Sequence, residues 1–119
     1  MSTQAVLATH AHFVSVELNI EAPDVQAIGD KMQTINQEAD MNGFNWDAFM
    51  DRYLAMTYPE MREGLERDPE INIYLGLYEN TEIGNKKARI LAAILNKLIS
   101  KPEIIYDYLR EDGDGVEWI

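Results

Sequence analysis

Histidines and paired carboxylates are the side chains of this sequence best suited to hold a metal ion or to move a proton. His10 and His12 are two residues apart in a segment of alternating polarity. A period of two would place both rings on one face of a strand, which is a spacing that a metal-ligand pair can use. The sequence has no cysteine and no third histidine, so a carboxylate would have to complete the site. A polar strand end explains the pair more simply, and we expect no metal site.

Acidic side chains also form pairs at helical spacing. Asp47 and Asp51 are four residues apart, as are Asp107 and Glu111, and this spacing places each pair on one face of a helix. General acid–base catalysis further requires a cleft and a shifted pKa. With 21 acids among 119 residues such pairs arise by chance. We therefore expect no catalytic residues and no cofactor.

Two short glycine motifs point to no ligand site either. The run Asp112-Gly113-Asp114-Gly115 has the composition of the start of a calcium loop, but the remaining ligands and the bidentate glutamate at the twelfth position do not follow it. Asn42-Gly43 precedes a predicted helix and does not fit a phosphate-binding loop.

The net charge of −11 is the most informative bulk property. Such a charge repels nucleic acid and anionic membrane surfaces, so we expect neither as a partner. Two interpretations remain open: the charge keeps the protein soluble, or it attracts a basic protein partner and speeds its association. Residues 86–101 carry five basic side chains and no acid, and we interpret them as the solvated face of a helix.

The length of 119 residues fits one domain, residues 1–119. The first residues lack the basic and apolar regions of a signal peptide, and no run approaches the roughly 20 apolar residues of a membrane span. Together with the lack of cysteine, these features predict a cytoplasmic protein. We expect residues 1–9 to be weakly ordered and residues 112–119 to form an acidic tail.

The elements that must position these side chains follow from hydrophobic periodicity. Alternation predicts strands over residues 10–20 and 71–78, and helical spacing predicts helices over 23–35 and 86–99. Two more helices are expected, one after an N-cap at Asn45 that is interrupted at Tyr58-Pro59, and one after a capping box from Ser100 to Glu103. Because two strands make a poor sheet, we expect a further short strand or a hairpin in the first forty residues. The predicted fold class is α+β, with a small, mostly antiparallel sheet packed against about four helices.

Aromatic residues divide into core and surface candidates. Trp46, Phe49 and Tyr53 share one helix face and are predicted to lie in the core. Tyr74 and Tyr78 project from the strand face opposite the isoleucines, where they either pack under a helix or form an exposed stripe. Exposed aromatic residues among acids are typical of interface hot spots.

From about Asp40 onward the chain resembles a known family. The run over residues 42–49, Asn-Gly-Phe-Asn-Trp-Asp-Ala-Phe, precedes a helix that closes at Tyr58-Pro59. Asp68-Pro69-Glu70 then leads into a strand, and a lysine-rich helix with Leu91 and Leu95 follows. This pattern resembles the immunity protein 51 family of bacterial polymorphic toxin systems over residues 40–111. We expect the motif residues themselves to shape the fold; they are Asn42, Gly43, Phe44, Asn45 and Trp46.

The resemblance implies a cytoplasmic, non-catalytic protein that binds a cognate toxin domain and blocks it. The acidic charge favours a basic toxin, for example a nuclease. The residues expected at the contact are acids and aromatics: Asp40, Asp47, Asp51, Tyr74, Tyr78, Asp112, Asp114, Glu117 and Trp118. Two alternatives stay open, a regulatory or assembly domain that forms a homo-oligomer through its aromatic strand face, and a small enzyme or ligand-binding domain. The sequence allows either a monomer or a homodimer.

Overall fold

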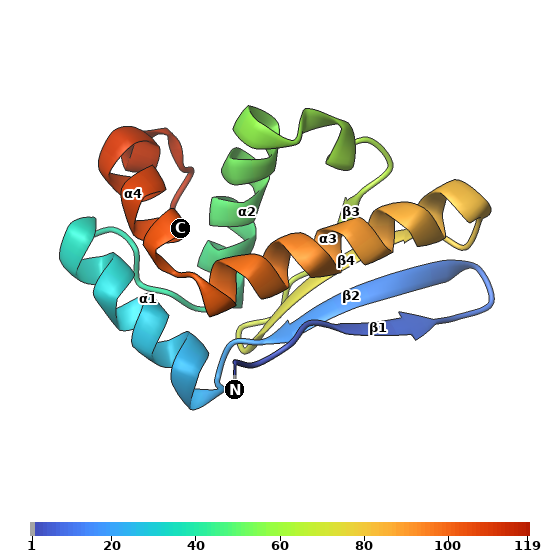
Figure 1. Ribbon diagram of the computed structural model, residues 1–119, viewed down its shortest axis with the longest axis horizontal. Helices are drawn as coiled ribbons and strands as arrows, with labels where there is room; N and C mark the ends of the chain where they lie inside the picture. The colour runs from blue at the N-terminus through green and yellow to red at the C-terminus, as the bar shows by residue number, and fades with distance from the viewer. Residues whose placement is uncertain (1) are drawn as a thin grey trace.

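An antiparallel sheet with helices packed on one face forms the framework of the protein, whose computed structural model describes residues 2–119 (Figure 1). Across these residues the structure contains four α-helices and four strands, which confirms the predicted α+β class. The elements in chain order are β1 (Val6–Thr9), β2 (Phe13–Asn19), α1 (Pro23–Ile35), α2 (Gly43–Thr57), the short 3-10 helix η1 (Pro59–Met61), β3 (Glu66–Arg67), β4 (Ile73–Glu79), α3 (Glu82–Ser100), α4 (Glu103–Asp112) and the 3-10 helix η2 (Gly113–Gly115).

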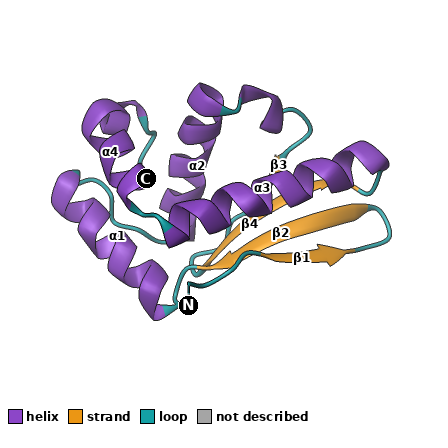
Figure 2. Cartoon of the chain, viewed as in Figure 1, coloured by secondary structure: helices purple, strands orange, loops and turns teal. Residues whose placement is uncertain are grey.

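The sheet has the strand order β1-β2-β4-β3, and every neighbouring pair is antiparallel. Figure 2 shows α3 running across one face of this sheet, with α2 beside it and α1 and α4 at the far end. Helix α3 contacts β1, β2 and β4, and α2 contacts β4. The helices therefore cover one face of the two central strands.

The core lies between this sheet face and the helices. Its members alternate along the strands and recur at helical spacing, as amphipathic elements require. The buried side chains predicted from the sequence include Val14, Val16, Leu18, Val25, Ile28, Met32, Trp46, Phe49, Tyr53, Leu91, Leu95 and Leu98. Burying each large side chain contributes about 1.5–3 kcal/mol, so the sheet–helix interface supplies most of the stabilisation.

The N-terminal region differs from the prediction. A single strand over residues 10–20 is wrong, because the chain turns at Ala11 and His12 and the main-chain N–H of His10 donates to the carbonyl of Phe13 at 2.8 Å. Residues 6–9 form β1 and pair with β2, where we expected a weakly ordered segment over residues 1–9 (Met1 lies outside the described residues). The turn contains none of the Gly, Asn or Pro residues that usually mark hairpins, so the sequence did not reveal its position. The further short strand that we expected in the first forty residues is confirmed as β1.

Two helix starts also differ from the prediction. Helix α3 begins four residues early because the side chain of Thr81 accepts a hydrogen bond from the N–H of Gly84 at 3.0 Å and caps the helix. The capping box before α4 is wrong, since the hydroxyl of Ser100 donates to the carbonyl of Lys97 at 3.1 Å. No helix within residues 2–119 combines the length and the apolar composition needed to cross a bilayer.

Candidate functional site

The loop before α2 anchors the helix that organises the site. The N–H of Gly43 donates to the carbonyl of Ile71 at 2.7 Å, and a Cβ at this position would lie 1.7 Å from the main-chain oxygen of Glu70. Only glycine fits this approach. The cap is the side chain of Asn42, which accepts from the N–H of Asn45 at 3.0 Å. The prediction of Asn45 as the N-cap is therefore wrong by three residues, because the close approach of Gly43 starts the helix earlier.

Asn45 is instead a buried connector between two distant segments. Asn45 as a whole residue is only 1% exposed to solvent. The amide nitrogen donates to the carbonyl of Asp40 at 2.7 Å, and the amide oxygen accepts from the N–H of Ile119 at 2.8 Å. One side chain thus fixes residues 36–42, between α1 and α2, against the segment that follows α4.

That C-terminal segment, which we expected to form an acidic tail over residues 112–119, packs against the rest of the protein. Val116 is buried, and the indole N–H of Trp118 donates to the carbonyl of Gly113 at 3.1 Å. The segment lies between α4 and α2 (Figure 1). Trp118 is half-buried, and its polar atom is already satisfied inside the protein.

Four exposed carboxylates lie on these two adjoining segments, and a fifth, Glu111, lies near the end of α4. A Cβ on Gly113 would lie 3.1 Å from the amide nitrogen of Asn36, which places the loop after α1 directly beside η2. Residues 36–42 and 113–119 contain no lysine or arginine. We call this surface the acidic end, and its exposed members are Glu38, Asp40, Glu111, Asp114 and Glu117.

Asp47 and Asp51 lie on α2, but both are engaged by arginines. Arg67 makes a bidentate pair with Asp47, with Nη2 2.7 Å from Oδ2, and its other terminal nitrogen lies 3.5 Å from Asp51. Arg62 donates to the same Asp51 at 3.0 Å. The hydrogen bonds to Asp47 raise the pKa of Arg67 despite partial burial. These two carboxylates hold α2 to the segment around β3.

Asp112 is engaged in the same way at the other side of α2. Arg52 binds it through two parallel hydrogen bonds of 2.8 and 3.0 Å, and the hydroxyl of Tyr108 donates to it as well. Hydrogen bonding by Arg52, then by Tyr108, lowers the pKa of Asp112 to about 2. Partial burial, and then the hydrogen bond to this carboxylate, raise the pKa of Tyr108 to about 12. Asp112 therefore stays charged and joins α4 to α2.

The two tyrosines of β4 are core residues, so their expected place in a contact surface is wrong. Tyr74 is 1% exposed and Tyr78 2% exposed. The register places Tyr78 opposite Val14 and Tyr74 opposite Leu18 on the inward face, and the hydroxyl of Tyr78 donates to the carbonyl of Met61. Burial raises the pKa of Tyr78 to about 12 and also raises that of Tyr74. Because these tyrosines are buried, they cannot form the exposed aromatic strand face on which the alternative of a homo-oligomer depended.

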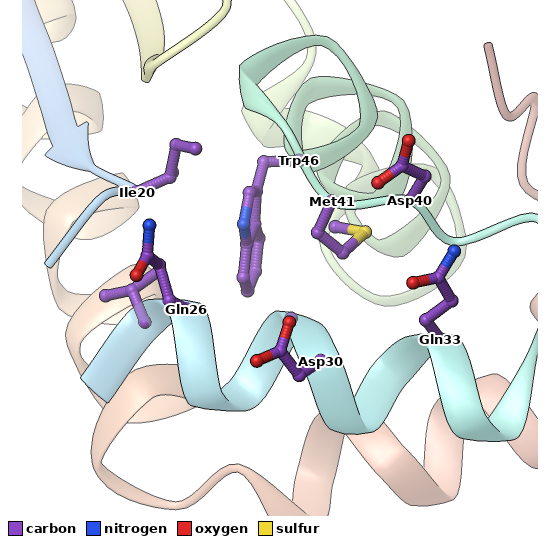
Figure 3. Close-up of a pocket in the computed structure, with 9 residues that line it drawn as sticks. Ile20, Gln26, Asp30, Gln33, Asp40, Met41 and Trp46 are labelled. Atoms are coloured by element: carbon purple, nitrogen blue, oxygen red, sulfur yellow. The ribbon is translucent and has the colours of Figure 1, made fainter. Parts of the chain in front are cut away.

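A pocket of about 250 Å³ adjoins the acidic end (Figure 3). Its wall is the indole of Trp46, a side chain that is otherwise enclosed by the core. Carboxylates of Asp30 and Asp40 and the amides of Gln26 and Gln33 form the polar part of the lining. Oxygen atoms of these groups accept hydrogen bonds, so the pocket suits a cationic or amide-bearing side chain.

The remaining charged candidates are dispersed. His10 precedes the hairpin turn and His12 lies in it, and the ring of His10 stacks on Phe13 at 4.2 Å between centroids. Among residues 2–119 no three His, Asp or Glu side chains are placed to share a metal ion. Lys86 and Arg89 are exposed on α3.

Sequence reasoning missed the arginines that pair with the predicted acids. Arg52, Arg62 and Arg67 meet their partners across 60, 11 and 20 residues of sequence, so no local spacing reveals them. Arginine favours bidentate pairing with carboxylates, but such pairs can be recognised only after the fold has brought the distant segments together.

Comparison with known proteins returned no match: no family model, curated protein or solved structure is similar to the chain. The likeness to the immunity protein 51 family therefore rests on the sequence motif alone.

Proposed function

We propose that the protein is a cytoplasmic immunity protein that binds a basic toxin domain through its acidic end and blocks it by occlusion. The observation that carries this proposal is the set of four exposed carboxylates, Glu38, Asp40, Asp114 and Glu117, on two adjoining segments that contain no basic residue, with the exposed Glu111 nearby on α4. Of the nine expected contact residues, Asp40, Asp114 and Glu117 are exposed on this surface, and Trp118 is half-buried. Glu117 also borders a second pocket together with Arg52, Arg62 and Arg67.

The distribution of charge supports a basic partner. Three of the arginines neutralise Asp47, Asp51 and Asp112 around α2, whereas the acids of the acidic end are exposed. A like-signed cluster of this kind raises the association rate with a positively charged protein and makes that rate dependent on salt. Solubility alone requires no such clustering.

The rigid setting of the acidic end also supports a binding role. Asn45 ties both of its segments to α2, so little ordering entropy is lost when a partner binds. The pocket beside Asp40 gives one arginine or lysine of the partner a place to insert, and such an anchor fits the usual composition of interface hot spots.

Co-expression with the toxic C-terminal domain encoded by the adjacent gene tests the proposal. Growth should be rescued, and the two proteins should purify together as a stable complex. A variant with Asp40→Asn, Asp114→Asn and Glu117→Gln should lose rescue.

The matched control removes the same charge elsewhere. Glu63→Gln, Glu66→Gln and Glu79→Gln change three exposed acids that lie toward the hairpin end of the molecule, and this variant should rescue growth like the wild type. Equal killing with and without the wild-type protein would contradict immunity itself, and equal rescue by both variants would contradict the acidic end as the binding surface.

A further inference from the structure

Strand β1 leaves one edge of the sheet open. The closing pair of the hairpin is His10 with Phe13, and hydrogen-bonded pairs alternate with non-bonded pairs along an antiparallel ladder. Ala8 and Val6 therefore bond to β2, whereas the N–H and C=O groups of Leu7 and Thr9 point away from it. Within residues 2–119 these four groups have no hydrogen-bond partner outside the sheet ladder.

This edge carries none of the features that usually protect one. Natural edge strands are blunted by charges, proline, bulges or a covering element. The four residues of β1 are uncharged, contain no proline, pair with β2 without a bulge and are all exposed. The N–H of Ala5, which precedes the strand, is occupied by the side chain of Asn96 at 2.7 Å, so the open edge is limited to Leu7 and Thr9.

The distribution of charge indicates which kind of partner can pair with this edge. The first 16 residues contain no Asp, Glu, Lys or Arg in a chain of net charge −11. A basic partner gains no electrostatic attraction here, whereas two copies of this acidic chain meet with least repulsion where charge is absent.

We propose that β1 pairs with β1 of a second copy of this chain, in an antiparallel arrangement about a two-fold axis that passes beside Ala8. In this register Leu7 lies opposite Thr9 of the second copy, and Thr9 opposite its Leu7. The two pairs exchange four main-chain hydrogen bonds and satisfy every open group of the edge. The alternative register pairs Leu7 with Leu7 of the second copy. It sets Thr9 opposite Ala5, whose N–H already donates to the side chain of Asn96.

Side chains fit the same arrangement. Ala8 faces Ala8 of the second copy as a non-bonded pair, where the Cα atoms approach to about 4.5 Å. Val6, which is 59% exposed, lies opposite His10 of the second copy, whose ring stacks on Phe13. The dimer joins two four-stranded sheets into one, and it leaves the acidic end of each copy free.

Sedimentation equilibrium over a range of concentrations tests the dimer. The mass should rise from the chain mass of 13.6 kDa to twice that value. A protein that stays monomeric up to roughly 1 mM, where even weak pairs form, would overturn the proposal.

A charge swap at the axis tests the register. Ala8→Glu and Ala8→Lys should each be monomeric because two like charges meet at the axis, and an equal mixture of the two variants should form a heterodimer. This rescue also shows that both variants fold. Ala11→Glu, which adds the same charge in the hairpin turn, should leave the dimer intact. Dimerisation of either Ala8 variant alone, or no heterodimer on mixing, would overturn the pairing through β1.

Amide hydrogen exchange locates the new bonds. The amides of Leu7 and Thr9 should be protected at concentrations where the dimer forms and should exchange rapidly in the Ala8→Glu variant. Amides of Val6 and Ala8, which bond to β2, should be protected in both. Rapid exchange at Leu7 and Thr9 in a dimeric sample would place the interface elsewhere and overturn the proposal.

Discussion

Replacement of Asn45 by alanine is expected to lower the free energy of unfolding by about 2–3 kcal/mol. The substitution removes two hydrogen bonds, of 2.7 Å to Asp40 and 2.8 Å from Ile119, and leaves a partly buried carbonyl and a partly buried N–H without their partner. An unsatisfied buried polar group costs about 1–3 kcal/mol, and water reaches this margin of the protein because Asp40 and Ile119 are themselves exposed. Two such groups would cost about 2–6 kcal/mol together. The expected loss of stability therefore lies in the lower half of that range.

Urea unfolding followed by far-UV circular dichroism and tryptophan fluorescence measures this loss. With a slope of about 1–3 kcal/mol per molar urea, the midpoint should fall by about 0.7–3 M. Asn72→Ala is the matched control, because Asn72 is exposed and its side chain makes no hydrogen bond within residues 2–119; it should change stability by less than about 0.5 kcal/mol. Equal midpoints for the two variants would refute the role of Asn45 as the connector of the acidic end.

Three further predictions concern the framework around the site. Gly43→Ala should prevent cooperative folding, measured by thermal denaturation, because the new methyl group would lie 1.7 Å from the main-chain oxygen of Glu70; a normal melting curve would contradict this packing. Tyr78→Phe should cost about 1–3 kcal/mol in urea unfolding because a buried carbonyl loses its donor, and an unchanged midpoint would count against that bond. Because the pKa of Asp112 is lowered from 3.8 to about 2, first by Arg52 and then by Tyr108, its stabilising effect should be complete above about pH 5 and lost as the pH falls toward 2. The difference in urea midpoint between wild type and Asp112→Asn should shrink over that interval, and a constant difference would disprove the pair.

The elements with regular periodicity were predictable from the sequence, and those set by single contacts were not. Helix α1 matches its predicted bounds because Val25, Ile28 and Met32 form an unambiguous apolar stripe. Strand β4 has apolar residues on both faces, so the sequence pattern favoured the isoleucine and leucine face as the core. The structure buries Tyr74 and Tyr78 instead, since the register with β2 and a hydroxyl bond decide the orientation.

The candidate site was predictable in part. Asp40, Asp114 and Glu117 were expected at a partner surface, and all three are exposed on the two segments that Asn45 joins. Asp47 and Asp112 were expected there too, but they pair with Arg67 and Arg52 inside the fold. Such pairings depend on tertiary packing between distant segments, and no spacing in the sequence encodes them.

The association rate between the protein and the adjacent toxin domain, measured by stopped flow as a function of salt, tests the central claim most directly. The wild-type rate should fall steeply as ionic strength rises from about 0.01 to 1 M, because the Debye length shrinks from about 30 to 3 Å. The Asp40→Asn, Asp114→Asn, Glu117→Gln variant should associate slowly with little salt dependence, and the Glu63→Gln, Glu66→Gln, Glu79→Gln variant should stay close to wild type. A wild-type rate independent of salt, or equal losses in both variants, would contradict binding through the acidic end.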